Sequence, residues 1–396
     1  MGAQQAGLLG PLVQFVIMDA PSTRRRRLTL ALLALLGSLA ILVCKHDQKA
    51  AWDTAVGRTL AVVAPYAPAE LPHAPLLGEP IHGEAVADFE AASEWRGLHG
   101  EGEEPPWYEV MAMDKLPADL DARLQPLLPA FDRLAAGAAA DRIDERKFLA
   151  LFLRETNELY TLPPRALPIG TALLTSPALT AARVDLAAGR PEAAVQRTAA
   201  VLTLARDQFG IDFGVYDLIA AVHVAVVDQV WNDDRLRSLP ASAQKSFAVA
   251  LGRFDETVAP ATRCMFGECA RALQVNEQRQ RRFCTAADLR AYADALPALP
   301  AESAPWAVRE PALASFSRAS RWTGDLVYIE RYRRRAIAQV RLLRMALAMY
   351  LGEVMAPLDD PLAHGQIAVT ERDGQTVLAS RAAFDGKPIE RLVKRP

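Results

Sequence analysis

The chain has 396 residues, of which 51% are hydrophobic and 23% are charged, and its formal net charge at pH 7 is −2. This composition can supply a sizeable hydrophobic core, and it excludes an intrinsically disordered protein, which combines low hydrophobicity with high net charge. Residues 1–45 hold five basic residues and one acidic residue, so the rest of the chain carries a net charge of −6. A mildly acidic body argues against general nucleic-acid binding, which requires a basic face.

An uncharged apolar run, Leu28 to Cys44, follows four arginines at 24–27. As a helix it would span about 26 Å, which is the short end of what crosses a bilayer and is longer than most signal-peptide cores. No small-x-small cleavage site follows the run, and Val43 is not the small residue that precedes a lipoprotein cysteine. We therefore predict an uncleaved transmembrane anchor; a cleaved signal and a buried helix are the alternatives.

The four arginines also predict how the anchor is oriented, because basic flanks stay on the cytoplasmic side of a membrane. Residues 1–27 would form a cytoplasmic leader, residues 28–44 the anchor, and the body would be exported. The abundance of alanine and arginine is typical of a GC-rich bacterium. The predicted location is therefore the bacterial inner (cytoplasmic) membrane, with a single pass and the body in the periplasm.

Residues 45–110 are predicted to form a helix and a proline-rich stalk. The helix continues through Ala50–Val63, and the stretch 64–83 then contains five prolines, which cannot be helical for long. A second break at 99–109 carries the acidic cluster Glu101, Glu103 and Glu104, which we interpret as a solvated loop. This region would hold the body away from the lipid.

Residues 111–356 are predicted to form a helical domain, and its clearest local signal is a helical hairpin. Ser176 is expected to be an N-cap and Pro177 the first helical residue. Gly189 lies where a left-handed C′ residue belongs, Pro191 opens a second helix, and Gly210 closes it. The short joint between the two helices predicts that they run antiparallel.

This hairpin resembles one unit of the tetratricopeptide repeat family. The resemblance is carried by Ala182, Leu186, Gly189, Arg190, Pro191, Ala193 and Ala194. It covers about 35 residues, and no second good copy follows at the 34-residue period of such arrays. The resemblance therefore implies an irregular, repeat-like helical body rather than a tandem array.

Further helices are predicted along the rest of this domain. The apolar segment 215–231 is interrupted by Asp217, His223 and Asp228, so we expect a buried central helix rather than a second span. The other expected helices lie near 241–257, 260–282, 285–295 and 323–355. The last one has an apolar stripe of Val340, Leu343, Leu347, Leu351 and Val354, and it is expected to stop at Pro357 and Pro361.

Residues 357–396 are predicted to form a C-terminal β-hairpin tail. Asp373-Gly374 lies between two alternating runs, which is a strong hairpin signal. Asp360, Pro361 and Gly365 precede the hairpin. Together with the hairpin, they make this end of the chain resemble the C-terminal end of pseudopilins and of certain other exported bacterial proteins. The span lacks the pilin processing pattern, so the resemblance implies no pilin function.

The hairpin is expected to need support, because a lone two-stranded hairpin is only marginally stable in water. We expect Ile367 and Val369, or Val377, to pack on the stripe at 340–354. The alternative is a projecting hairpin that adds a strand to a partner. The predicted fold class is thus mostly α, with an N-terminal transmembrane helix, an irregular, repeat-like helical bundle and a small C-terminal β-hairpin.

Residues that could carry chemistry show no catalytic or metal-binding pattern. The four cysteines are Cys44, Cys264, Cys269 and Cys284, and their spacing is not that of a zinc site. Their pairing stays open; a local Cys264–Cys269 loop would require a helix break at Gly267. The six histidines are scattered, and His223 is expected to be a core histidine with its hydrogen bonds satisfied. No cofactor is predicted.

The carboxylate pairs Glu155/Glu158 and Glu84/Asp88 are interpreted as solvated faces, and no G-x-S-x-G motif or phosphate loop occurs. Two arginine groups are more distinctive. They are Arg279, Arg281 and Arg282, and Arg333, Arg334 and Arg335. They predict a docking site for an anionic partner or for anionic lipid head groups, and solvated helix faces are the alternative.

These features together favour a membrane-anchored, exported scaffold or protein-interaction module of the bacterial cell envelope. Its partners would be the membrane, through Leu28 to Cys44, and an envelope protein, but no nucleic acid. The alternative is an envelope enzyme, a carboxylate-dependent hydrolase with a groove between helices. A third hypothesis, a lipid- or pilus-associated assembly factor, depends on the C-terminal hairpin alone. Facing carboxylates across a deep groove would favour the enzyme, and shallow apolar grooves would favour the module.

Overall fold

A computed structural model describes residues 46–63, 110, 113, 115–128, 131–132, 135, 168–209, 214–258, 284–319 and 326–394. The predicted anchor at 28–44, the proline-rich stretch at 64–83, the acidic loop at 99–109 and the helix expected at 260–282 lie outside these residues. None of the helices in the described ranges combines the length and the apolarity that a bilayer span requires.

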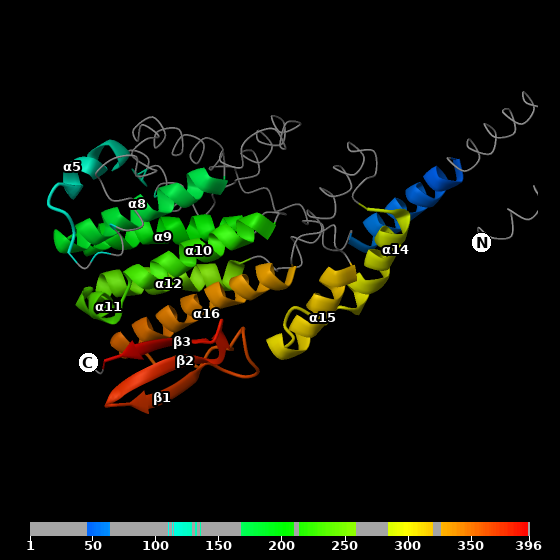
Figure 1. Cartoon of the computed structure of the whole chain (residues 1–396). Helices are drawn as coiled ribbons and strands as arrows, with labels where there is room; N and C mark the ends of the chain where they lie inside the picture. Colours follow the sequence, from blue (N-terminus) through cyan, green and yellow to red (C-terminus); the bar gives the residue numbers. More distant parts are fainter. Residues whose placement is uncertain are drawn as a thin grey trace, which may run out of the picture.

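The described part of the chain is mostly helical and ends in a small antiparallel sheet (Figure 1). Residues 46–63 are helical. The further helices are α5 (Leu120–Leu124), η3 (Gln125–Leu127), α8 (Pro168–Ala187), α9 (Pro191–Gln208), α10 (Gly214–Val230), α11 (Asp233–Ser238), α12 (Ala241–Thr257), α14 (Ala286–Ala295), η5 (Leu296–Ala298), α15 (Trp306–Ala319) and α16 (Leu326–Tyr350). The strands are β1 (Ala368–Arg372), β2 (Gln375–Phe384) and β3 (Lys387–Val393).

The helical hairpin predicted from the sequence is formed by α8 and α9, and Gly189 makes its turn. Gly189 has a φ of 72°, and its N–H donates to the carbonyl of Leu186 at 3.1 Å. The N–H of Arg190 donates to the carbonyl of Asp185 at 2.8 Å, which completes a Schellman motif. The Asp185 carboxylate accepts hydrogen bonds from Arg190 and Arg197, each at 2.9 Å. These bonds link the end of α8 to the turn and to α9.

The start of this hairpin differs from the prediction. Ser176 is not an N-cap, because α8 begins at Pro168 and Pro177 lies inside the helix. A proline fixes φ near the helical value and removes one main-chain hydrogen bond, so it is compatible with a helix interior where packing compensates. Ala178, Leu179 and Ala182 are buried directly after it. Packing has therefore overridden the local start signal.

The apolar segment near 215–231 is confirmed as a buried central helix. It forms α10, which packs against α8, α9 and α16. Val224, Val227 and Trp231 are completely buried, and the indole N–H of Trp231 donates to the Thr198 hydroxyl at 2.9 Å. In Figure 1 this helix lies within the stack of α8, α9, α12 and α16.

The long helix α16 carries the predicted apolar stripe but ends earlier than expected. Leu343 and Leu347 are completely buried, whereas Val354 lies beyond the helix and is fully exposed. Gly352, with a φ of 67°, ends the helix, and the N–H of Glu353 donates to the carbonyl of Ala348 at 2.9 Å. A left-handed glycine therefore terminates α16 before the prolines are reached.

The C-terminal tail is a three-stranded sheet rather than a hairpin. Asp373 and Gly374 have φ values of 52° and 74°, as the two central residues of a type I′ turn require. A second Asp-Gly pair, Asp385-Gly386, has φ values of 49° and 73° and turns β2 into β3. The third strand was not predicted, although a second Asp-Gly dipeptide in the sequence signals the turn before it.

The sheet packs against the helical body through β2 and β3, which contact α16 (Figure 1). Ile367 is buried in the main core, as expected, and so is Leu378. The prediction is wrong for Val369, which is 51% exposed, because β2 and β3 make the main contacts with α16; the alternative residue, Val377, is buried. Arg391 on β3 donates to the Asp228 carboxylate and to the carbonyl of Trp231, which fixes the sheet to α10.

Asp360 organises the corner that leads from α16 into the sheet. Its buried carboxylate accepts from the N–H of Leu362 at 3.0 Å, from the Ser380 hydroxyl at 3.0 Å and from the N–H of Arg381 at 2.6 Å. The N–H of Ile367 donates to the carbonyl of Leu358 at 2.8 Å. The corner is therefore held by its own polar contacts before the strands begin.

Replacing Ile367 by alanine is expected to lower the free energy of unfolding by about 2–4 kcal/mol, because a buried large-to-small change loses apolar transfer energy and leaves a cavity. Val369→Ala is the matched control, since an exposed position is expected to change stability by no more than about 0.5 kcal/mol. Urea denaturation of the full chain in a mild detergent measures both. Equal effects of the two variants would contradict the packing of the sheet.

Residues 46–63 contact the body through α14. Trp52 and Ala55 pack with Cys284 and Leu289 in a small core, and the Thr59 hydroxyl donates to the carbonyl of Leu289 at 3.1 Å. The helical part of the predicted 45–110 region therefore belongs to the packed structure rather than standing free of it.

Candidate functional site

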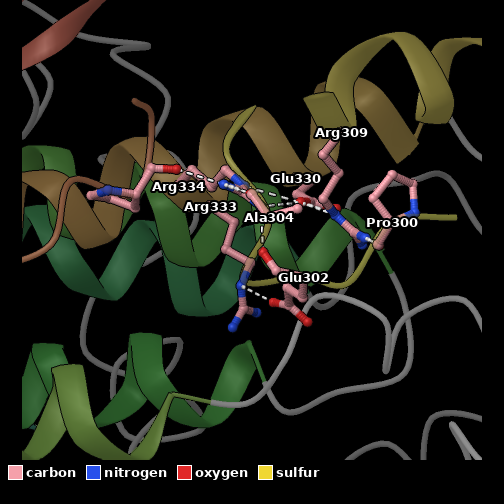
Figure 2. A network of polar contacts seen from close by, with 8 residues as sticks. Pro300, Glu302, Ala304, Arg309, Glu330, Arg333 and Arg334 are labelled. Atoms are coloured by element: carbon pink, nitrogen blue, oxygen red, sulfur yellow. Dashed lines mark hydrogen bonds and ion pairs between the residues drawn. The ribbon is translucent and has the colours of Figure 1, made fainter. Parts of the chain in front are cut away.

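Two of the predicted site residues on α16, Arg333 and Arg334, belong to a buried network of charges (Figure 2). Glu330 is 2% exposed, and one of its carboxylate oxygens accepts from the Arg309 guanidinium at 2.5 Å and from the Arg334 guanidinium at 3.0 Å. Arg309, which is 1% exposed, also donates to the carbonyl of Pro300. One carboxylate thus serves two buried guanidinium groups that come from α15 and α16.

Arg334 links three segments of the chain. It donates to the carbonyl of Glu302 at 2.6 Å and to the carbonyl of Pro361 at 2.6 Å, and its guanidinium lies over the Trp306 ring. Figure 2 shows the contacts of Arg334 with the loop before α15, where Glu302 and Ala304 lie. Arg334 therefore has a structural role in joining α15, α16 and the C-terminal tail.

Arg333 and Arg335 are less completely satisfied. Arg333 is buried over the Phe209 ring, and its ion pair with Glu302 is long, at 3.8 Å. Arg335 is half-buried over the Phe384 ring. Within the described ranges, the Arg333 Nη1 and Arg335 Nε atoms have no hydrogen-bond partner.

The alternative of a solvated helix face is wrong for Arg333 and Arg334, because both side chains are buried by other segments of the chain. An anion could reach them only by displacing those segments, so docking at this group stays a prediction. Arg279, Arg281 and Arg282 lie outside the described residues, as do the carboxylate pairs Glu155/Glu158 and Glu84/Asp88.

His223 lies in the core as predicted, but the hydrogen bonds expected for its ring are not found among the described residues. It is completely buried, and neither ring nitrogen has a hydrogen-bond partner among the described residues. Burial lowers its pKa to about 3, because the interior cannot solvate the charged imidazolium. Asp228 lies five residues after His223 on α10, and its carboxylate accepts hydrogen bonds from Arg391 and Gln339.

Cys284 is the only cysteine among the described residues, and it is not poised for reaction. Its thiol is buried, and burial raises its pKa to about 11, with a further contribution from the nearby Asp288 carboxylate. A thiol is reactive only as the thiolate, so this environment makes Cys284 inert near neutral pH. In the ranges that the structure covers, no group of three or more metal-ligating side chains gathers.

A hollow lies between α9 and α12. These helices run in the same direction, because the Ser242 hydroxyl donates to Glu192 at their N-terminal ends and Phe209 packs on Phe254 at their C-terminal ends. The hollow has a volume of about 590 Å³. Its lining on α9 extends from Gln196 to Arg206, which corresponds to a length of about 15 Å. We call this hollow the α9–α12 groove.

The α9–α12 groove combines an apolar floor with basic side chains. Its apolar lining includes Leu202, Ala250 and Phe254, and Val249 stands at the rim with 56% of its surface exposed. Its basic residues are Arg206, which is buried, and Lys245 and Arg253, which are exposed; neither arginine is without a partner. No aspartate or glutamate occurs in the lining that the structure describes. The groove therefore presents apolar and basic side chains together.

The α9–α12 groove was not predicted from the sequence, although one signal was present. Lys245, Val249 and Arg253 are spaced four residues apart, so they share one face of α12. A valine between two cations on a solvent-facing stripe is an exposed apolar residue, which can mark a binding surface. Its pairing with α9 could not be read from the sequence.

No protein-family model, curated protein or solved structure that was compared with this chain matches it.

Proposed function

We propose that this chain is a membrane-anchored, exported interaction module of the bacterial cell envelope, and that its helical body holds a partner protein in the α9–α12 groove. The observation that carries the proposal is the open groove itself, with its apolar floor, its exposed Val249 and its three cations. Helical scaffolds commonly bind partners by receiving an apolar face in such a groove.

The location in the proposal is supported by the sequence. The apolar run from Leu28 to Cys44 has the length of a short span, and the arginines at 24–27 favour an N-terminus in the cytoplasm. With that orientation the body lies in the periplasm, where an envelope protein is the available partner. The helix at 46–63 packs on α14, so an anchored chain would hold the body close to the membrane.

The lining of the α9–α12 groove also favours a binding function over a carboxylate-dependent hydrolase. General acid–base hydrolysis uses carboxylates that face each other across the substrate site. The described lining of the groove supplies cations, amides and hydroxyls instead. Such a lining can attract and orient an acidic surface, but it contributes no carboxylate that could transfer a proton.

A variant at the rim of the groove tests the proposal. We expect Val249→Asp to remove at least one envelope protein from the set that co-purifies with the tagged full chain, because a carboxylate at the rim repels an acidic surface and disrupts apolar contact. Quantitative mass spectrometry after cross-linking in membranes measures the set. Val308→Asp on α15 is the matched control, since Val308 is also 56% exposed. Identical sets for the wild type and both variants would contradict the proposal.

A further inference from the structure

The buried arginines of α15 and α16 contact a short loop, residues 299–305 between η5 and α15, which we call the strap. We propose that the strap is a displaceable cover over a binding site for a phosphate monoester. Displacement of the strap by the ligand would make the conformation of this part of the body depend on phosphate. The proposal is independent of the α9–α12 groove and goes beyond the interaction module.

Arginine side chains hold the strap through its oxygen atoms. The Arg309 guanidinium donates to the carbonyl of Pro300. The Arg334 guanidinium donates to the carbonyl of Glu302 at 2.6 Å, and the Glu302 carboxylate lies 3.8 Å from the Arg333 guanidinium (Figure 2). The strap thus places acceptor oxygens on three guanidinium groups, as an anionic ligand would.

The strap has little buried surface of its own to keep it closed. Each of its residues is half-buried or exposed, whereas Leu296 before it and Trp306 after it are buried. A segment with few buried apolar contacts opens at a lower free energy than the core that flanks it. Opening also returns guanidinium groups to water, which offsets part of the lost hydrogen bonding. The strap can therefore open while α15 and α16 stay folded.

The closed network leaves buried polar atoms without partners. Among the described residues, Arg309 Nη2 and Arg333 Nη1 have no acceptor, and Glu330 Oε2 has no donor. Buried N–H groups that lack an acceptor cost free energy, so the closed arrangement is not fully satisfied. An anion with several oxygen atoms would supply the missing acceptors to the two guanidinium groups.

The charge of the network selects among anions. Within the described residues, Arg309, Arg333 and Arg334 face the carboxylates of Glu330 and Glu302, so three positive charges meet two negative charges. Glu302 would leave with the strap, and the open site would then have three positive charges against one, a net charge of +2. A phosphate monoester carries about −1.5 to −2 at pH 7, whereas a carboxylate carries a single charge. The monoester therefore matches the open site, and its oxygens suit planar guanidinium groups.

Two measurements on the full chain in zwitterionic lipid nanodiscs test the proposal. Equilibrium dialysis with radiolabelled inorganic phosphate gives the Kd, and hydrogen–deuterium exchange reports on the amides of residues 299–305. We expect saturable binding of phosphate and faster exchange in the strap at saturating phosphate. Sodium chloride at the same ionic strength is the control and should leave the exchange of the strap unchanged.

Two variants locate the binding at the strap. Glu302→Gln should bind phosphate about two- to fivefold more tightly, because it removes a carboxylate that competes for Arg333 through a weak ion pair. Glu353→Gln, at an exposed position after α16, is the matched control and should keep the wild-type Kd. Arg333→Gln should weaken binding about tenfold or more, because a charged donor to the ligand is lost. If Arg333→Gln fails to fold, the change in Kd of Glu302→Gln decides the test.

Nanodiscs that contain phosphatidic acid distinguish the source of the phosphate, since this lipid carries the same monoester. Faster strap exchange with the lipid but not with free phosphate would support the site and assign it to a lipid head group. Strap exchange that changes with neither form of phosphate would overturn the proposal. Phosphate binding without a change in strap exchange, or an equal effect of acetate on the strap, would overturn it as well.

Discussion

Replacing Glu330 by glutamine is expected to lower the free energy of unfolding by about 3–5 kcal/mol, the cost of breaking a buried ion pair from one side. The variant keeps the size of the side chain but leaves Arg309 and Arg334 buried without their shared carboxylate (Figure 2). Urea denaturation of the full chain, followed by tryptophan fluorescence, measures the change. Trp306 lies beside Arg334 and reports on this region.

Two further variants test whether the loss of stability in Glu330→Gln comes from the buried charge network. Glu353→Gln removes an exposed carboxylate just after α16 and should change stability by no more than about 0.5 kcal/mol. Arg309→Met combined with Glu330→Gln should cost less than the sum of the two single changes, because one unpaired charge is then absent. Additive losses, or a Glu330→Gln effect as small as that of Glu353→Gln, would show that the network is not held by this carboxylate.

Acidification is expected to destabilise the body through His223. Its pKa is lowered from about 6.5 to about 3 in the folded protein, so below pH 6.5 the unfolded chain binds a proton that the folded chain does not. Folding stability therefore falls as pH falls from about 6.5 towards 3, by roughly 1.4 kcal/mol for each pH unit. At pH 3.5 this one side chain is expected to cost about 4 kcal/mol.

His223→Leu should remove that dependence, because leucine has a similar volume and cannot bind a proton. The loss of unfolding free energy between pH 7.5 and pH 3.5 is expected to be smaller in the variant by about 4 kcal/mol. His364→Leu, at an exposed position, is the control and should keep the wild-type loss. A wild-type loss in His223→Leu would mean that the imidazole is already protonated in the folded state or reaches solvent.

Several elements could be predicted because their signals are local. The helix at 241–257 has the expected bounds, and the turns at Gly189 and at Asp373-Gly374 have the left-handed backbone that glycine permits. Turn chemistry and helical periodicity depend on residues within a few positions of each other. The errors at the end of α16 and at the third strand arose where one local signal was preferred to another that was also present, whereas at Pro177 packing overrode the local start signal.

The sequence by itself determined the helical class of the body, the turn residues and the composition of each helix face. Only the tertiary structure decided which faces meet. Arg334 became a buried joint because Glu302 and Pro361 approach it from segments about 30 residues away on either side, and Lys245 became part of a groove because α9 lies beside α12. Solvent exposure of a charged or apolar side chain is set by what packs against it, and periodicity along one helix does not contain that partner.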